Sequence, residues 1–326
     1  MSAPVALTLG DPAGIGGEIA LKAWARLGGT LPFFLIGDRD YMGALSRGLG
    51  IALREIGRPG EAATAGDGLP LLHHPLARPA TPGTADPANA AAVIENIARG
   101  AGLVREGAAA ALCTNPINKR LLVEGAGFAF PGHTEYLAAL CGAPRPVMML
   151  AAPALRVVPV TIHIPLAQVP SALTASLLEE TLRVTRAGLV SDFGLPEPRI
   201  AVAGLNPHAG EGGAMGREEA EVIAPVLDRL RGEGWDIAVP LAADTLFHPA
   251  ARARYDAAVC MYHDQALIPI KTIAFDEGVN VTLGLDFVRT SPDHGTAFDI
   301  AGRGVADPSS LVAALVMARD MAARRA

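Results

Sequence analysis

Residues 5–27 read VALTLGDPAGIGGEIALKAWARL, and their pattern predicts the fold class of the whole chain. The apolar run Val5–Leu9 has the length of a buried strand, and Glu18–Leu27 has the apolar spacing of an amphipathic helix. A glycine-rich turn joins the two segments. A strand, a turn and a helix in this order are typical of an α/β protein with a mainly parallel sheet.

The same alternation continues to the end of the chain. Further strands are predicted at Phe33–Ile36, Ala109–Cys113, Val147–Leu150, Val157–Ile162, Ile200–Ala203 and Ala257–Met261. Further helices are predicted at Ala88–Glu106, Ser171–Leu189, Arg217–Leu230 and Ser309–Ala323. The segment Gly66–Ala85 is rich in proline, glycine and alanine and is predicted to be a surface connection. Ligand sites of such folds form in the loops that leave the carboxyl ends of the strands.

Composition excludes several classes of protein. A length of 326 residues indicates two domains or one large one, and a hydrophobic fraction of 50% with only 5% aromatics predicts a core mostly of alanine, valine, leucine and isoleucine. A net charge of −6 with scattered basic residues argues against a general nucleic-acid binder. The most hydrophobic stretch, 147–169, is interrupted by three prolines, so we expect no membrane helix. Three widely spaced cysteines argue against a disulfide framework and favour a cytoplasmic location.

The glycine-rich turn Gly10–Glu18 has two interpretations. Asp38 follows the second predicted strand, at the distance that a dinucleotide-binding fingerprint requires. The fingerprint is defective, however, because Ile19 stands where its third glycine belongs. The turn is therefore either a cradle of backbone amides for an anion or a tight connection that allows close packing.

Three histidines stand at the ends of three predicted strands. They are His163, His208 and His263, and polar or glycine-rich residues follow each of them. A single histidine in such a place is usually held by hydrogen bonds alone. Three in equivalent places suit a divalent metal that keeps positions open for water or substrate.

Other polar clusters fall at the same strand ends. His133 and Thr134 suit a phosphate or a carboxylate, although Thr134 is equally suited to cap a helix that begins at Glu135. Asp244 and Asp264 suit either proton transfer and polarisation of a histidine or the capping of turns. The segment 271–304 contains Lys271, Asn280 and Arg289, which together suit an anionic substrate such as a phosphate ester, and surface ion pairs are the alternative.

Seven phrases in order identify a resemblance over residues 7–315. They are GDPAGIG, TNPINK, PGHTE, LNPHAGE, YHDQ, GVNVTLG and RTSPDHGTA, which begin at residues 10, 114, 131, 205, 262, 278 and 289. Together they resemble the 4-hydroxythreonine-4-phosphate dehydrogenase family of pyridoxal phosphate biosynthesis. One departure is Asp286, which stands where the resemblance predicts proline, and we expect no loss of activity from it.

The resemblance implies a fold, a reaction and an assembly. The fold is two α/β/α domains with a cleft, similar to isocitrate and isopropylmalate dehydrogenases, with residues 1–135 and 270–326 in the first domain and 136–269, with the dimer interface, in the second. The reaction is oxidation of the substrate's 3-hydroxyl by NAD or NADP, followed by decarboxylation to 3-amino-2-oxopropyl phosphate. The assembly is a homodimer whose active site is shared, and we expect His163 and His208 from one chain and His263 from the other.

The resemblance also implies roles for single residues. The metal ligands are His163, His208 and His263, for one zinc, magnesium or cobalt ion per site. The substrate-binding residues are His133, Thr134, Lys271, Asn280 and Arg289. The catalytic residues are Lys271, Asp244 and Asp264, and the cofactor is expected along the loops 210–216 and 294–302.

Two alternative functions remain at this point. One is a metal-dependent dehydrogenase of another phosphorylated four-carbon acid, such as threonate or erythronate 4-phosphate. The other is an anion-binding or phosphoacyl-transfer protein without redox chemistry, against which the three histidines argue because acyl transfer needs no such metal site.

Overall fold

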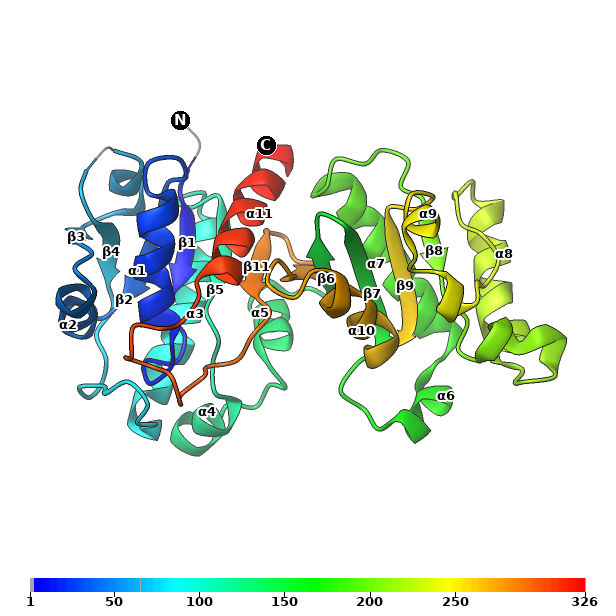
Figure 1. Cartoon of the computed structure of the whole chain (residues 1–326), viewed down its shortest axis with the longest axis horizontal. Coiled ribbons are helices and arrows are strands. Elements are labelled where there is room, and N and C mark those ends of the chain that lie inside the picture. The colour runs from blue at the N-terminus through cyan, green and yellow to red at the C-terminus, as the bar shows by residue number, and fades with distance from the viewer. Residues whose placement is uncertain (1–2, 65, 326) are drawn as a thin grey trace. The chain divides into compact units, whose positions relative to one another are not determined.

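The structure, a computed structural model, describes residues 3–64 and 66–325 and divides into two compact units. The first unit extends to Ala143 and resumes at Leu285, and the second is Pro144–Gly284. Each unit is a sheet with helices on both of its faces (Figure 1). The predicted α/β class is confirmed.

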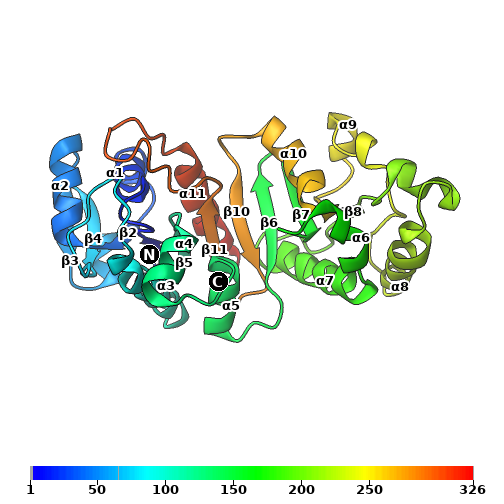
Figure 2. The ribbon, with the colours of Figure 1, turned by 90° about the horizontal axis from the view of Figure 1, so that it is seen from below.

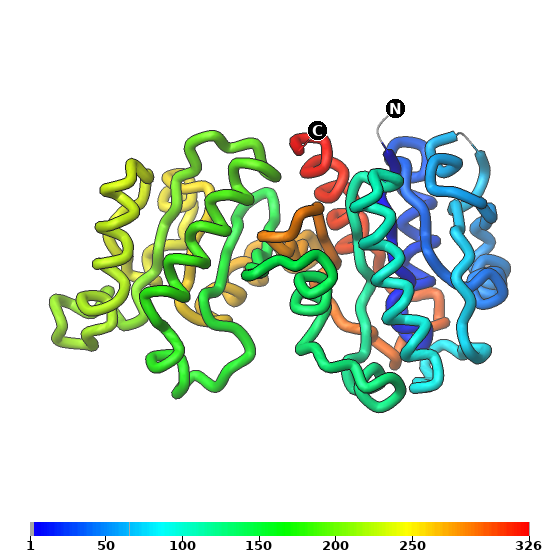
Figure 3. The backbone as a smooth tube through the Cα atoms, turned by 180° about the vertical axis from the view of Figure 1, so that it is seen from behind, coloured from blue at the N-terminus to red at the C-terminus, as the bar shows by residue number. Residues whose placement is uncertain are grey.

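The first unit is built on a parallel sheet in the order β3-β4-β2-β1-β5-β11. Its strands are β1 (Val5–Thr8), β2 (Phe33–Gly37), β3 (Leu53–Ile56), β4 (Leu69–His73), β5 (Ala111–Thr114) and β11 (Arg289–Pro292). Its helices are α1 (Gly16–Leu27), α2 (Arg39–Leu49), α3 (Ala90–Arg105), α4 (Lys119–Ala126), α5 (His133–Cys141) and α11 (Ser309–Arg325). Helices α1 and α11 pack together on one face, and α3 covers the other, as the view from behind shows (Figure 3).

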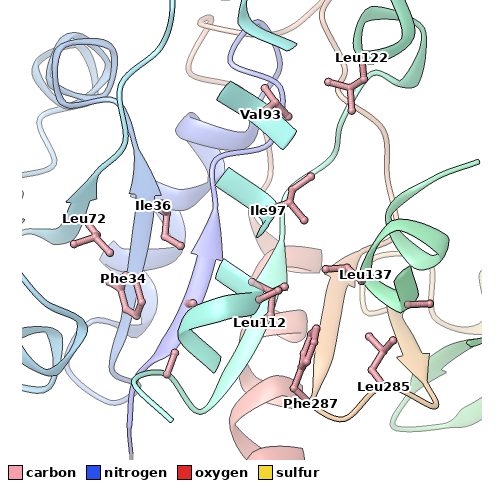
Figure 4. Close-up of a cluster of buried hydrophobic side chains, with 14 of the residues drawn as sticks. Phe34, Ile36, Leu72, Val93, Ile97, Leu112, Leu122, Leu137, Leu285 and Phe287 are labelled. Atoms are coloured by element: carbon pink, nitrogen blue, oxygen red, sulfur yellow. The ribbon is translucent and has the colours of Figure 1, made fainter. Parts of the chain in front are cut away.

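The core of this unit follows from the alternation of side chains along its strands. Phe34 and Ile36 of β2 and Leu112 of β5 point to the face that α3 covers, where they meet Ile97 (Figure 4). Gly100 lets α3 approach closely, because a Cβ there would lie 2.7 Å from Leu112 Cδ1. Helix α3 therefore packs closely enough to bury this face of the central strands.

The segment 66–85 corrects one prediction. Its residues Leu69–His73 form β4, which lies between β3 and β2 and is buried over its first four residues. The prediction of a surface connection is therefore wrong for this part. The run is only five residues long and contains Pro70, and such a run has the sequence signature of a loop.

The second unit is a mixed sheet in the order β10-β6-β7-β9-β8. Its strands are β6 (Val147–Ala152), β7 (Leu155–Thr161), β8 (Ile200–Val202), β9 (Ala257–Tyr262) and β10 (Val279–Leu283). Strand β6 pairs antiparallel with β7 and β10, whereas β9 pairs parallel with β7 and β8. Its helices are α6 (Val169–Ala172), α7 (Ala175–Ser191), α8 (Ala224–Gly232), α9 (Pro249–Arg252) and α10 (His263–Ile273). Helices α7 and α10 cover opposite faces (Figure 2).

The boundary between the units differs from the expected one. Residues 270–284, expected in the first domain, belong to the second unit because β10 pairs with β6 along its whole length and α10 packs on β7 and β9. Residues 136–143, expected in the second domain, complete α5, which packs against α3 of the first unit.

Candidate active site

His163 and His263 lie side by side in the second unit. Their ring centroids are 5.7 Å apart. Strands β7 and β9 run parallel with Thr161 opposite Tyr262, and Thr161 Oγ1 donates to Met261 O at 2.7 Å. His263 follows the end of β9 directly, and His163 stands two residues after the end of β7. Because these two strand ends are joined, residues one hundred positions apart in the chain meet.

The surroundings of this pair suit a metal. His263 Nδ1 lies 2.7 Å from Asp264 Oδ1, an arrangement that fixes the ring and leaves Nε2 available to an ion. His163 has φ of 54°, a left-handed conformation that a residue with a side chain adopts at a cost. Strain of this kind is concentrated at functional sites.

His208 does not join the pair. It follows β8 at the edge of the same sheet, in the exposed segment Pro207–Gly213, and its φ is 52°. Within residues 3–64 and 66–325, no group of three or more His, Cys, Asp or Glu side chains is placed to hold one ion. Within one chain the histidines that meet are His163 and His263, and the expected division, with His163 and His208 from one chain and His263 from the other, stays a prediction.

Arg289 is buried in the first unit. It lies at the start of β11, is 3% exposed, and donates from Nη2 to Thr114 Oγ1 of β5 at 2.7 Å. Burial lowers the pKa of its guanidinium to about 10. The alternative of a surface ion pair is therefore wrong for Arg289, and a buried guanidinium suits an anionic partner.

His133 lies close to Arg289 and has an unused ring nitrogen. Its Nε2 is buried and has no hydrogen-bond partner among the residues that the structure describes. Burial, and secondarily the charge of Arg289, holds the pKa of His133 well below its usual range, so the ring is neutral at physiological pH. A buried polar atom without a partner points to a ligand that supplies one.

Thr134 does not cap a helix. Helix α5 begins at His133 with Gly132 as its N-cap and no side-chain cap, so the capping interpretation is wrong. Thr134 lies in the first turn beside His133, at a helix end whose free backbone N–H groups favour anions. Thr134, His133 and Arg289 thus all belong to the first unit.

The remaining predicted residues belong to the second unit. Lys271 lies in the last turn of α10 with its Nζ 5.9 Å from the centre of the Phe275 ring, and Asn280 is half-buried in β10. Asp244 is exposed on the short 3₁₀ helix Ala243–Thr245, which packs beside the segment that carries His208. Asp264 therefore contacts His263, whereas Asp244 lies on a helix beside the segment that carries His208.

The glycine-rich turn is explained by close packing. Asp38 caps α2, since its Oδ1 accepts from Asp40 N and Tyr41 N, and its Oδ2 accepts from Leu76 N. A Cβ at Gly14 would lie 2.7 Å from Thr296 O, and one at Gly16 would lie 2.2 Å from Leu9 O. Asp38, the acidic residue of the dinucleotide interpretation, thus has a structural role. Gly14 allows the loop 294–302 to pack on this turn, and Gly16 allows the turn to pack against Leu9, just after the end of β1.

Sequence reasoning missed two residues. In the sequence Thr114 is only the first residue of the phrase TNPINK, with no predicted role in the site, yet its hydroxyl holds Arg289. Glu219 was placed only within a helix, yet it is 6% exposed and accepts from Asn206 N at 2.7 Å, two residues before His208. In the sequence Glu219 stands between Glu218 and Glu221, and no local pattern singles it out. Asp286, the departure from the expected proline, forms an exposed ion pair with Arg105 at 3.0 Å.

Comparison with known proteins identifies the family. The model of the family "Pyridoxal phosphate biosynthetic protein PdxA" matches residues 30–318. The 4-hydroxythreonine-4-phosphate dehydrogenase of Paracoccus denitrificans (strain Pd 1222) is 59% identical over 326 residues, covering 99% of this chain and 98% of that protein. The crystal structure of the enzyme of that name from Klebsiella pneumoniae is 39% identical with a TM-score of 0.89, covering 98% of this chain and all 100% of that one. This chain belongs to the PdxA family of pyridoxal phosphate biosynthetic proteins.

Proposed function

We propose that this chain is a 4-hydroxythreonine-4-phosphate dehydrogenase. It oxidises the 3-hydroxyl of 4-phosphooxy-L-threonine with NAD or NADP, and the product loses carbon dioxide to give 3-amino-2-oxopropyl phosphate. The observation that carries the proposal is the buried Arg289 beside His133, whose buried Nε2 has no hydrogen-bond partner among the described residues, because a buried guanidinium and such a ring nitrogen together suit an anionic ligand. The names of the relatives in the same family support the choice of substrate.

A divalent metal fits the paired histidines. His163 and His263 would supply two imidazole ligands from one chain, and Asp264 would hold the ring of His263. The third ligand, His208, would come from the partner subunit. A zinc, magnesium or cobalt ion held there would lower the pKa of a substrate hydroxyl and so would favour its oxidation by the nicotinamide cofactor.

A homodimer completes this site. Large exposed apolar side chains follow the two histidines in the chain, with Leu166 67% exposed after His163, Ile268 63% exposed on α10, and Phe275 73% exposed just beyond that helix. A dimer interface that covered these side chains would remove them from water. A two-fold dimer through the second unit would create two equivalent sites that share ligands.

Substrate binding and proton transfer are assigned to side chains of this chain. The guanidinium of Arg289 binds an anionic group of the substrate, the neutral His133 donates or accepts one hydrogen bond, and the Thr134 hydroxyl adds another. Asn280 supplies an amide, and Lys271 supplies either a proton or a positive charge during decarboxylation. Asp244 and Asp264 orient the histidine-bearing segments beside them.

The location and the cofactor site extend the proposal. No helix within residues 3–64 and 66–325 is long and apolar enough to span a membrane. We assign the chain to the cytoplasm because Cys113 and Cys260 are buried free thiols, as expected in a reducing compartment. The nicotinamide cofactor is assigned to the loops 210–216 and 294–302.

The test is reduction of NAD or NADP, followed by absorbance, with 4-phosphooxy-L-threonine and a divalent metal. Turnover with this substrate and its loss after chelation are expected. Threonate 4-phosphate and erythronate 4-phosphate serve as competitors under the same conditions. A higher kcat/KM for either of these acids would overturn the choice of substrate.

A further inference from the structure

Residues His208–Gly212 form a left-handed turn. Their φ angles are 52°, 51°, 80°, 42° and 67°, and three of the five residues are not glycine. For L-amino acids this conformation is unfavourable, because Cβ crowds the following carbonyl oxygen. A run of this length persists only where its surroundings hold it.

The carboxylate of Glu219 holds the start of this turn. Its Oε1 accepts from Asn206 N at 2.7 Å, and its Oε2 accepts from Asn206 Nδ2 at 3.0 Å. Asn206 Nδ2 also donates to Glu218 Oε2 at 2.7 Å. Asn206, two positions before His208, is thus held by hydrogen bonds from both its backbone N–H and its side-chain amide.

Three glycines enclose the same carboxylate and amide. A Cβ at Gly210 would lie 2.6 Å from Glu219 Oε2, and one at Gly204 would lie 3.0 Å from Glu219 Oε1. At Gly216, a Cβ would lie 2.2 Å from Asn206 Nδ2. Glu219 itself opens a short π-helix, Glu219–Ile223, a feature that occurs frequently at functional sites. The loop is therefore wrapped around one buried carboxylate.

We propose that Glu219 is a positioning residue that maintains the left-handed turn and so fixes the direction in which His208 leaves the sheet edge. The inference rests on the proposed function, in which His208 is the third metal ligand. A carboxylate is required because both groups that face it, Asn206 N and Nδ2, are donors. A glutamine of the same shape would turn an NH₂ group towards one of them.

The first experiment measures zinc affinity by competition with a chromophoric chelator. Glu219→Gln is expected to weaken the affinity about tenfold or more, in line with the loss of residues that orient ligands. Glu221→Gln is the matched control, because Glu221 lies on the same π-helix, is exposed, and pairs with Arg217 at 3.0 Å instead of Asn206. It is expected to bind zinc as the wild type does.

A rescue variant separates positioning from general damage. Ala209 has φ of 51°, which glycine adopts without a steric penalty. Adding Ala209→Gly to Glu219→Gln should therefore recover several-fold in zinc affinity, because the turn then needs less support. If Glu219→Gln does not fold, Asn206→Ala removes the side-chain part of the same contact and takes its place.

The outcomes distinguish this inference from the proposed function. Wild-type zinc affinity in Glu219→Gln, with the affinity lost in His208→Ala, overturns the positioning role and leaves the metal site standing. Wild-type affinity in His208→Ala removes His208 from the ligand set. In that case hydrogen exchange of the metal-free protein tests whether Glu219 maintains the turn. Faster exchange of amides 206–216 in Glu219→Gln supports this role, and unchanged exchange refutes it.

Discussion

Arg289 and Thr114 are joined by a hydrogen bond of 2.7 Å between neighbouring strands, although 175 residues separate them in the chain. Strand β11 pairs with β5 so that Arg289 stands opposite Leu112, and the guanidinium then reaches Thr114 at the carboxyl end of β5. Both side chains are almost fully buried. The hydroxyl fixes one edge of the guanidinium, and the direction of its remaining donors follows from this contact.

Replacing Arg289 by lysine should weaken substrate use. Lysine keeps the charge and loses the planar pair of donors that binds an anionic oxygen pair, so we expect kcat/KM to fall by roughly 10- to 100-fold. The dissociation constant of the cofactor, measured by fluorescence titration, should change far less. Arg105→Lys, at an exposed pair with Asp286, is the matched control. An unchanged kcat/KM in Arg289→Lys would assign Arg289 a purely structural role.

The Thr114 hydroxyl can be tested separately from the charge. Thr114→Val has nearly the same volume but leaves Arg289 Nη2 without this acceptor, and we expect KM to rise by about tenfold with a smaller change in kcat. Thr114→Ser keeps the hydroxyl and should behave as the wild type. Equal kinetics in the valine and serine variants would show that the contact does not orient Arg289.

Subunit exchange tests the sharing of the metal ligands. Mixing inactive His208→Ala dimers with inactive His263→Ala dimers should restore about a quarter of the sites, because random exchange makes half the dimers mixed and each mixed dimer has one intact site. Mixing His163→Ala with His263→Ala should restore no sites. In the proposed arrangement each site takes His163 and His263 from the same chain, so every site of a mixed dimer lacks one of them. Recovery in this second mixture would instead support the division of His163 and His208 against His263.

The contact between Asp264 and His263 predicts an effect on metal affinity. Asp264→Ala removes the group 2.7 Å from His263 Nδ1, and we expect zinc affinity to fall by about 10- to 100-fold. Competition with a chelator measures the change, and Asp228→Ala on the exposed side of α8 provides a control of the same chemistry. Full affinity after the Asp264 substitution would show that the ring of His263 is held by its packing alone.

The lowered pKa of His133 predicts a loss of stability in acid. Above pH of about 6.5 the ring is neutral in both the folded and the unfolded chain, whereas below it only the unfolded chain binds the proton. The free energy of unfolding should therefore fall with decreasing pH, by up to about 1.4 kcal/mol per pH unit from this group. Urea unfolding of wild type and His133→Gln between pH 5.5 and 7.5 measures the slope, which should be shallower in the variant. Identical slopes would contradict the buried, neutral state of His133.

The alternation of strands and helices can be predicted from the sequence alone, because apolar periodicity is a local property. The strand at Val5–Thr8, the helix at Ala90–Arg105 and the three histidines at strand ends were all predicted from neighbouring residues. The other polar clusters at strand ends also follow from local pattern, and the resemblance to the family implies a role for each of them.

Only the tertiary structure decided which of these residues meet. In the chain β8 comes between β7 and β9, so His208 stands between His163 and His263 in the sequence. In the sheet β8 is the edge strand and β7 lies directly beside β9, which brings His163 to His263 and leaves His208 at the edge. The order of strands in a sheet depends on long-range packing, and the contact that holds Arg289 comes from Thr114, 175 positions away. The left-handed turn at His208 depends on a carboxylate of the following helix, so hydrophobic periodicity does not reveal it.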